Sequence, residues 1–469
     1  MTLTCFKAYD VRGRLGHDLD EGIARAIGRG LAAARAPRRA VIGRDARDSS
    51  AGLAAALAEG LMAGGVEVVD IGLCGTEEVY FATDHLGADA GLCVTASHNP
   101  IDYNGIKLVG PGARPLSPAD LDAVREAAER DHPDAARPGT RHGADPRAAY
   151  VERVLSFIDP AALAPLKVLV NAGNGAAGPT FDAIAAALAA RGAPVTWVRM
   201  HHDPDPSFPN GIPNPLLEEN RPPTARAVVA QGCDLGLAWD GDFDRCFFFD
   251  HEGRFVPGEY MVGLLAEAFL ASHPGARIVH DPRVCWNTID IVRSHGGVPV
   301  ASRTGHAFLK AAMREADAVY GGEMSAHHYF RDFMSCDSGM IPALLVLARI
   351  SATGRSLAEL VAARRAAFPS SGEINFRVAD AGVATARVLA AFAGRDAARD
   401  GSSFVTPLRD DAVTPLRDDL DGVSLDFPDW RFNLRRSNTE PLLRLNVETR
   451  ADPDLLARRV AELTALIEG

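Results

Sequence analysis

The chain has 469 residues, of which 47% are hydrophobic and 23% are charged, so wholesale disorder is excluded and several hydrophobic cores are expected. It carries 49 lysines and arginines against 61 aspartates and glutamates, and the net charge of −12 argues against a protein that coats nucleic acid or an anionic membrane. At roughly 100–200 residues per domain, the length predicts three or four domains.

Membrane and export signals are also missing from the sequence. No apolar run reaches the roughly 18 residues that a membrane span needs, and residues 1–10 lack the charged-then-apolar pattern of an export signal. The 7 cysteines are scattered and form no C-x-x-C pair, which disfavours a disulfide framework or a thiolate zinc site. We therefore expect a cytoplasmic protein with no membrane or nucleic-acid partner.

The first part of the chain alternates short apolar runs with stretches of helical pattern. The predicted strands are Ala40–Gly43, Val66–Gly72 and Gly91–Thr95, and the predicted helices are Ser49–Gly64 and Glu77–Leu86. Strands that alternate with helices indicate βαβ units and largely parallel sheets.

The same pattern restarts twice further along the chain. Strands are predicted at Leu166–Asn171, Val195–Met200, Leu235–Trp239, Ala276–His280, Val298–Ser302 and Ala318–Tyr320, and helices at Gly178–Arg191, Asn287–Gly296 and His306–Glu315. Three such blocks predict three similar α/β domains.

The C-terminal part differs, because its predicted strands follow one another and only then comes a helix. These strands are Ser424–Phe427, Trp430–Leu434 and Leu443–Glu448, and the helix starts at Pro453. This order predicts a smaller α+β domain. We place the domains at residues 1–145, 146–253, 254–370 and 371–469.

One segment is repeated: VTPLRDD at Val405–Asp411 recurs at Val413–Asp419. A docking motif is one interpretation. We favour a small tandem duplication in an exposed loop that tolerates insertion.

The first chemistry-bearing motif is Thr95–Pro100 (TASHNP), directly after a predicted buried strand. Its serine, Ser97, is thus expected at the C-terminal edge of a sheet, where open α/β sheets bind ligands. A serine hydroxyl becomes a nucleophile only beside a base, a metal or a charged neighbour. The alternative is an ordinary Asn-Pro turn with a capping serine, and this motif alone leaves both interpretations open.

The second motif is Asp240–Arg245 (DGDFDR), which follows the predicted strand Leu235–Trp239. Asp240, Asp242 and Asp244 alternate along a short loop, so their side chains can converge on one hard cation such as Mg²⁺. A solvated acidic turn is the alternative, and the apolar segments on both sides disfavour it.

Two later motifs are polar loops with weaker signals. Gly321–His327 (GGEMSAH) offers Glu323 and Ser325 to sugar hydroxyls, although an exposed glycine turn is the safer interpretation of this motif alone. Arg435–Pro441 (RRSNTEP) gathers hydroxyl, amide and guanidinium donors, and arginine can hold a phosphate with two hydrogen bonds. A capped loop with surface arginines is the alternative.

Two glycine-containing segments are candidates for contacts with phosphate groups. Arg12, within Tyr9–Gly13, precedes a glycine and could point at a phosphate. Asn171–Gly175 follows a predicted strand but matches neither the dinucleotide fingerprint nor a P-loop. We interpret it as a structural turn and expect no nucleotide cofactor.

The four motifs together, in this order and at these spacings, resemble the α-D-phosphohexomutases. The resemblance covers nearly the whole chain and is closest to the bacterial phosphomannomutases of the GDP-mannose branch, as in TASHNPIDYNGIKLV, FPNGIPNPLL and FNLRRSNTEPLLRLNVE. Two departures are Phe243, where many relatives carry glycine, and the repeated VTPLRDD segment, which looks like an insertion. The resemblance implies three similar mixed-sheet α/β domains and a smaller C-terminal α+β domain, heart-shaped around a central cleft.

The resemblance also implies a role for each motif. Ser97 would carry the phosphoryl group, and Asp240, Asp242 and Asp244 would hold Mg²⁺ together with it. The further catalytic residues would be His98, Lys107, Arg245, Arg12 and His306; proton transfer would fall to Lys107 first, with His98 and His306 as alternatives. The substrate would be held by Tyr9, Arg283, Gly305, Glu323, Ser325, His327, Arg435, Ser437, Asn438, Thr439 and Arg444.

The implied reaction interconverts mannose 6-phosphate and mannose 1-phosphate through a phosphoserine enzyme and a hexose 1,6-bisphosphate, which also acts as activator, and feeds GDP-mannose synthesis. The implied partners are small hexose phosphates, and the implied state is a monomer or weak dimer. The alternative is the same chemistry on glucose phosphates, alone or alongside mannose.

Two rival functions come from other classes. A sugar-phosphate-binding protein without turnover predicts a damaged nucleophile or metal loop, and both are intact here. A plain phosphatase has no use for a second phosphate site such as Arg435–Thr439.

Overall fold

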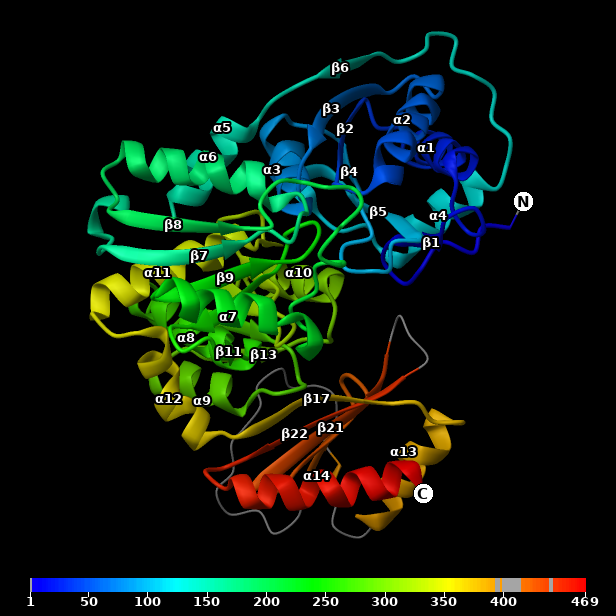
Figure 1. The fold of residues 1–469 in the computed structure, drawn as a ribbon. Coiled ribbons are helices and arrows are strands. Elements are labelled where there is room, and N and C mark those ends of the chain that lie inside the picture. The colour runs from blue at the N-terminus through cyan, green and yellow to red at the C-terminus, as the bar shows by residue number, and fades with distance from the viewer. Residues whose placement is uncertain (1, 393–396, 399–414, 438–441) are drawn as a thin grey trace. The chain divides into compact units, whose positions relative to one another are not determined.

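The computed structural model describes residues 2–392, 397–398, 415–437 and 442–469. Figure 1 shows the elements in chain order, from β1 near the N-terminus to the terminal helix α14. By compactness the chain divides into two units: Met1–Val256 with Asp332–Leu357, and Pro257–Arg331 with Ala358–Gly469.

The first sheet of the first unit has the strand order β1-β5-β4-β2-β3-β6. The strands β2, β3, β4 and β6 are parallel, whereas β1 and β5 run antiparallel to their neighbours. The strands are Val11–Arg14, Arg39–Arg44, Glu67–Leu73, Ala90–Val94, Tyr103–Val109 and Arg141–Gly143 for β1 to β6. The helices are α1 (Glu21–Arg35), α2 (Asp48–Ala63), α3 (Thr76–His85) and α4 (Pro118–Ala128), with the short η1 (Pro111–Ala113).

Alternation along β2 separates two cores, because successive side chains of a strand point to opposite faces. Ala40 and Ile42 join the core that also holds side chains of α1, α2 and α4. Val41 joins a second core on the other face, which holds side chains of α3. The sheet is therefore covered on both sides, and its loops at the strand ends are left to carry function.

The second sheet of the first unit has the order β11-β10-β9-β7-β8, with β7, β8 and β9 parallel and β10 and β11 added as antiparallel hairpins. The strands are β7 (Leu166–Asn171), β8 (Val195–Met200), β9 (Leu235–Trp239), β10 (Cys246–Asp250) and β11 (Phe255–Val256). The helices are α5 (Arg147–Leu155), α6 (Ala177–Ala190), α7 (Pro222–Gln231) and α11 (Met340–Thr353), with the short η2 (Pro160–Ala162) and η3 (Glu218–Asn220). The short strand β16 (Cys336–Asp337) belongs to the same unit but not to this sheet.

The second unit begins with the strand order β13-β12-β14-β15, parallel except for β15. The strands are β12 (Arg277–His280), β13 (Val298–Ala301), β14 (Tyr320–Gly322) and β15 (His328–Phe330). The helices are α8 (Gly258–Ser272), α9 (Trp286–Ser294), α10 (His306–Glu315) and α12 (Leu357–Ala367).

The last sheet, also in the second unit, has the order β17-β22-β21-β20-β19-β18 and is antiparallel except between β18 and β19. The strands are Ser370–Phe376, Ala397–Ala398, Leu416–Asp418, Val423–Asp426, Trp430–Arg436 and Leu443–Thr449 for β17 to β22, with helices α13 (Ala381–Ala391) and α14 (Pro453–Glu468). Asp452 caps α14 by accepting a hydrogen bond from Leu455 N, and Leu463 and Ile467 on that helix join the core of the sheet.

The predicted architecture of three mixed-sheet α/β domains and a smaller α+β domain is confirmed. The sheets are less parallel than the strand–helix alternation predicts, because β1, β5, β10, β11 and β15 pair antiparallel at the edges. The strand expected at Ala318–Tyr320 is shifted: Ala318 N donates to Met313 O at the end of α10, and the ladder starts at Tyr320.

The VTPLRDD repeat lies mostly outside the described residues, including the whole first copy. In the second copy, Leu416–Asp418 forms β19, which pairs antiparallel with β20. The expectation of an exposed loop is therefore wrong for these three residues, because the tight connection to β20 pulls them into the sheet.

In the described residues all 7 cysteines are buried, and none of them forms a disulfide. Across the same residues no single helix is long and apolar enough to cross a membrane, although Met340–Thr353 and Leu357–Ala367 pass as a pair by length and composition.

Candidate active site

Ser97 follows β4 and lies in the loop that leads to β5, as the sequence predicts. Its backbone is in the left-handed region, with φ of 51°, a conformation that residues other than glycine rarely adopt. The hydroxyl Oγ donates to Asp240 Oδ2 at 2.7 Å, and it lies 3.1 Å from His98 Nδ1 and 3.2 Å from Arg245 Nη2. The structure therefore gives this serine the charged neighbours that it needs to react.

The acidic loop Asp240–Arg245 connects β9 to β10 within an antiparallel hairpin. Phe243 turns the loop with φ of 44°, in the left-handed region that favours glycine. The Phe243 ring is buried against Gly75, where a Cβ would lie only 2.3 Å from the ring. All three aspartates are buried, and their oxygens lie within 4.8 Å of one another.

Lys107, on β5, balances part of this negative charge. Its Nζ donates to Asp242 Oδ2 at 2.7 Å and to Asp244 Oδ2 at 2.5 Å. Burial favours the neutral amine, but the two carboxylates outweigh it and raise the pKa of Lys107. Burial likewise acts against the Asp242 carboxylate, but Lys107 outweighs it and lowers the pKa of Asp242. This pair is therefore ionised at neutral pH.

The acidic loop fits a hard metal ion. Carboxylate oxygens and a serine hydroxyl are the ligands that Mg²⁺ prefers. Among the described residues, Asp242 Oδ1 is buried and accepts no hydrogen bond, which is costly unless a cation satisfies it. Burial also raises the pKa of Asp240, although Arg245 Nη2 lies 2.6 Å from Asp240 Oδ2. A bound cation would offset the cost of burying the Asp240 carboxylate.

Three other predicted residues lie around the Ser97 loop. Arg245 Nη2 is 2.5 Å from His98 Nδ1, and burial together with Arg245 and Arg12 holds the pKa of His98 well below its ordinary value. Arg12, on β1, donates to Asn99 Oδ1 at 2.7 Å and to Asp10 Oδ2 at 2.8 Å. Tyr9 is half-buried at the start of the same segment.

The second unit brings together the predicted sugar-binding residues. Arg283 Nη2 donates to Ser325 Oγ at 3.2 Å and lies 3.4 Å from Glu323 Oε1. Glu323 Oε1 also accepts from Gly305 N at 3.0 Å, and His327 Nδ1 lies 3.4 Å from Glu323 Oε2. His306 begins α10 directly after Gly305.

Three predicted substrate-binding arginines meet on one carboxylate. Glu373 Oε2 accepts from Arg435 Nη2 at 3.0 Å, Glu373 Oε1 lies 3.1 Å from Arg444 Nη1, and Arg283 Nη1 lies 3.5 Å from Glu373 Oε2. Burial opposes the negative charge of Glu373, but the three arginines outweigh this effect and lower the pKa of Glu373. Ser437 is half-buried just after β21. Asn438 and Thr439 lie outside the described residues.

The structure adds functional candidates that the sequence reasoning missed. Glu373 lies at a predicted domain boundary, where no motif singled it out. Thr76 begins α3 and donates from Oγ1 to Asp242 Oδ2 at 2.6 Å. Arg47 precedes α2 and bonds the Ser97 loop. The one local signal for Thr76 is a polar residue inside an apolar pattern. No local signal marks Glu373 or Arg47.

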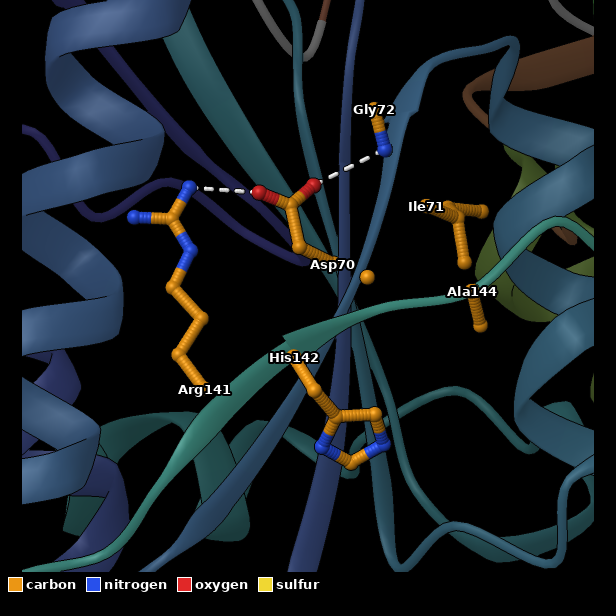
Figure 2. A pocket seen from close by; sticks show the side chains of 7 residues that line it. Asp70, Ile71, Gly72, Arg141, His142 and Ala144 are labelled. Atoms are coloured by element: carbon orange, nitrogen blue, oxygen red, sulfur yellow. Dashed lines mark hydrogen bonds and ion pairs between the residues drawn. The ribbon is translucent and has the colours of Figure 1, made fainter.

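The predicted site residues do not line the hollow beside β3 and β6. Figure 2 shows the Asp70 carboxylate there, held by Arg141 and by the Gly72 amide, and both bonds satisfy it within the protein. The full lining is Asp70, Ile71, Gly72, Arg141, His142, Gly143 and Ala144.

Comparison with known proteins agrees with this geometry over the whole chain. Models of the phosphoglucomutase/phosphomannomutase family match in order: α/β/α domain I at residues 4–134, domain II at 148–253, domain III at 257–368 and the C-terminal domain at 373–466. A phosphomannomutase of Salmonella montevideo is 55% identical over 472 residues, covering 100% of this chain and 99% of the relative. A phosphomannomutase of Escherichia coli is 52% identical over 469 residues, covering 99% of each.

A solved structure shows the same likeness. The crystal structure of a phosphoglucomutase/phosphomannomutase family protein from Burkholderia thailandensis superposes with a TM-score of 0.85 at 31% identity, covering 100% of this chain and 97% of that one. The chain therefore belongs to the phosphoglucomutase/phosphomannomutase family and is an isomerase that moves a phosphoryl group on a hexose phosphate.

Proposed function

We propose that the chain interconverts mannose 6-phosphate and mannose 1-phosphate through a phosphorylated Ser97 and a hexose 1,6-bisphosphate intermediate, and so feeds GDP-mannose synthesis. The observation that carries this proposal is the position of Ser97 Oγ, 2.7 Å from Asp240 Oδ2 and 3.2 Å from Arg245 Nη2. Relatives that are 52% and 55% identical carry the name phosphomannomutase, which supports mannose as the sugar.

The residues of the first unit suit the transfer step. Phosphoryl transfer depends on in-line positioning and on neutralising charge rather than on covalent chemistry by the protein. The P–O bond to Ser97 Oγ breaks as a sugar hydroxyl forms a new P–O bond. The hydroxyl proton passes to a protein group, and the departing Ser97 oxygen takes up a proton to become the hydroxyl again. Arg245 offsets negative charge on the group in flight.

Asp240, Asp242 and Asp244 would hold Mg²⁺, and Ser97 would contribute its phosphoryl oxygens. Bound there, the ion supplies Lewis-acid charge neutralisation. Lys107 remains our first candidate for the proton transfer, with His98 and His306 as alternatives. Because Lys107 is charged at neutral pH, it would act as the acid that gives a proton to the departing Ser97 oxygen. Its bonds to Asp242 and Asp244 fix where the Lys107 ammonium lies.

The residues of the second unit suit recognition of the sugar phosphate. Glu323, Ser325 and His327 present hydroxyl-binding groups, and Arg435 and Arg444 present guanidinium groups to the phosphate that is not transferred. We assign substrate contacts also to Tyr9, Arg283, Gly305, Ser437, Asn438 and Thr439, and a catalytic role to Arg12.

The remaining expectations belong to the same proposal. We propose that a hexose 1,6-bisphosphate also activates the enzyme, that the partners are small hexose phosphates, and that the protein is a cytoplasmic monomer or weak dimer. We also propose that its four domains divide near residues 145, 253 and 370.

The test is an assay of the purified full-length protein with mannose 1-phosphate, Mg²⁺ and a trace of glucose 1,6-bisphosphate. We expect mannose 6-phosphate to form with wild-type protein and with Ser156→Ala, an exposed serine outside the site, but not with Ser97→Ala. Equal rates in Ser97→Ala and wild type would overturn the proposal.

The alternative sugar is glucose, because the family models are named for both mutases. Relative kcat/KM values for the two sugar 1-phosphates decide the preference. A ratio above one for mannose supports the proposal, and a ratio well below one would make the chain a phosphoglucomutase.

A further inference from the structure

Arg47 holds the Ser97 loop from behind. Its guanidinium donates to four backbone carbonyls of that loop: Nη1 to Pro100 O at 2.9 Å and Tyr103 O at 3.1 Å, and Nη2 to Ser97 O at 3.0 Å and Asn99 O at 2.5 Å. The side chain is only 1% exposed. Four acceptors on one guanidinium leave it no free N–H on these two nitrogens for a ligand.

The guanidinium is itself fixed by the connection between β2 and α2. Arg47 Nε lies 3.5 Å from Asp45 Oδ2, and Arg47 N donates to Asp45 Oδ1 at 3.0 Å. Ser50 Oγ donates to the same Asp45 oxygen at 2.5 Å. The Phe208 ring lies 5.9 Å from the guanidinium carbon. The position of Arg47 is therefore set by the protein scaffold.

The loop needs such a partner for two physical reasons. Ser97 has a φ of 51°, which costs free energy in a residue other than glycine and persists only where neighbours impose it. Four carbonyl dipoles that point toward one place also repel one another unless a cation lies between them. Arg47 meets both needs, because its guanidinium is positively charged and donates a hydrogen bond to each of the four carbonyls.

We propose that Arg47 is a positioning residue for phosphoryl transfer: it fixes the backbone of the Ser97 loop so that Ser97 Oγ faces Asp240 and Arg245, without touching the reacting atoms. This inference rests on the proposed role of Ser97 as the phosphoryl carrier. A displacement of about 1 Å at a reacting atom can cost roughly 10²-fold in rate.

Lysine is the informative replacement for Arg47. It retains the positive charge, but its single ammonium nitrogen cannot span four carbonyls as the two guanidinium nitrogens do. Arg39→Lys is the matched control, because Arg39 lies on β2 in the same domain and its guanidinium is bonded to Glu67 near the surface.

The experiment measures how fast glucose 1,6-bisphosphate phosphorylates Ser97 in the full-length protein, by intact mass at timed quenches. We expect Arg39→Lys to match wild type and Arg47→Lys to be roughly 10²-fold slower, with the Mg²⁺ affinity in calorimetric titration changed less than twofold. In the mutase assay, Arg47→Lys should lower kcat and leave KM within about twofold.

If Arg47→Lys does not fold, Asp45→Asn takes its place, because it keeps the guanidinium and removes the carboxylate that orients it. We expect a roughly tenfold slower phosphorylation in that variant. A folded Arg47→Lys that is phosphorylated as fast as wild type would overturn the inference, even with a lower Tm, since Arg47 would then be structural only. Wild-type protein that gains no phosphoryl group would overturn the proposed function first, and the inference with it.

Discussion

Ser97 Oγ donates a 2.7 Å hydrogen bond to Asp240 Oδ2, across 143 positions of sequence. The serine comes from the loop after β4 and the aspartate from the loop after β9, each at the C-terminal end of a strand in a different sheet. One contact thus joins the predicted phosphoryl carrier to the predicted metal loop. Thr76, Gly241, Glu77 and Glu373 each give a further prediction.

Thr76 orients Asp242, because its Oγ1 donates to Asp242 Oδ2 at 2.6 Å and its N–H donates to Asp242 O at 3.1 Å. Thr76→Val keeps the side-chain shape and removes the hydroxyl. We expect it to weaken Mg²⁺ binding roughly tenfold, as loss of a partner that orients a metal ligand does. Calorimetric titration of the purified protein with Mg²⁺ measures this.

Thr76→Ser is the control for that substitution, since it retains the hydroxyl. Its Mg²⁺ affinity should stay within about twofold of wild type. If Thr76→Val binds Mg²⁺ as tightly as Thr76→Ser, the hydroxyl does not orient Asp242.

Gly241 is packed against the serine loop, and a Cβ there would lie 2.6 Å from Ser97 O. Gly241→Ala should push the Ser97 carbonyl away and lower kcat roughly 10²-fold. Gly143→Ala, where the nearest atom would be Asp70 O at 3.9 Å, should leave kcat unchanged. Equal kcat values in the two variants would show that the loop tolerates the added methyl group.

Glu77 makes stability depend on pH. Burial raises its pKa to about 8, although Tyr150 OH, Gly339 N and Ser338 bond the carboxyl group. The folded state therefore holds a proton that the unfolded state releases near pH 4.5. The contribution of protonated Glu77 to the free energy of unfolding is fully present below about pH 4.5. It falls by about 1.4 kcal/mol per pH unit as the pH rises to about 8.

Glu77→Gln removes that titration. We expect its free energy of unfolding, from urea curves between pH 5 and 8, to fall less steeply with pH than that of wild type by about 1.4 kcal/mol per unit. Glu126→Gln, at an exposed position on α4, should keep the wild-type slope. Parallel slopes for Glu77→Gln and wild type would contradict the assignment.

Glu373 is the shared acceptor of three arginines, so its charge offsets their mutual repulsion. Glu373→Gln should lower stability in phosphate-free buffer by about 3 kcal/mol, because buried positive charges lose their partner. Inorganic phosphate should then raise Tm more in Glu373→Gln than in wild type, since the anion replaces the missing charge. Thermal unfolding with and without phosphate checks this, and an identical phosphate response in both proteins would argue against it.

Much of the fold could be predicted because strong local periodicity marks its elements. β7 and β8 are found at the predicted residues, and the motifs of Ser97 and of the three aspartates follow β4 and β9 as expected. The alternation of strands and helices did not locate the antiparallel strands of these mixed sheets, since a hairpin strand such as β10 follows a loop rather than a helix.

The candidate site could be predicted only where its residues form a motif. Ser97 and the three aspartates stand in short polar runs after apolar strands, which sequence alone reveals. Thr76 bonds Asp242, 166 positions away, and Glu373 bonds Arg435, 62 positions away. Only the folded chain brings these partners together. Four arginines among the predicted site residues are each paired with a carboxylate: Arg12 with Asp10, Arg245 with Asp240, and Arg435 and Arg444 with Glu373.

Intact mass spectrometry shows whether Ser97 carries the phosphoryl group. Wild-type protein and Ser97→Ala are incubated with glucose 1,6-bisphosphate and Mg²⁺, and fragment masses locate any added group. We expect one added phosphoryl group in wild type, on Ser97, and none in Ser97→Ala. An unchanged wild-type mass, or the same gain in Ser97→Ala, would contradict this expectation.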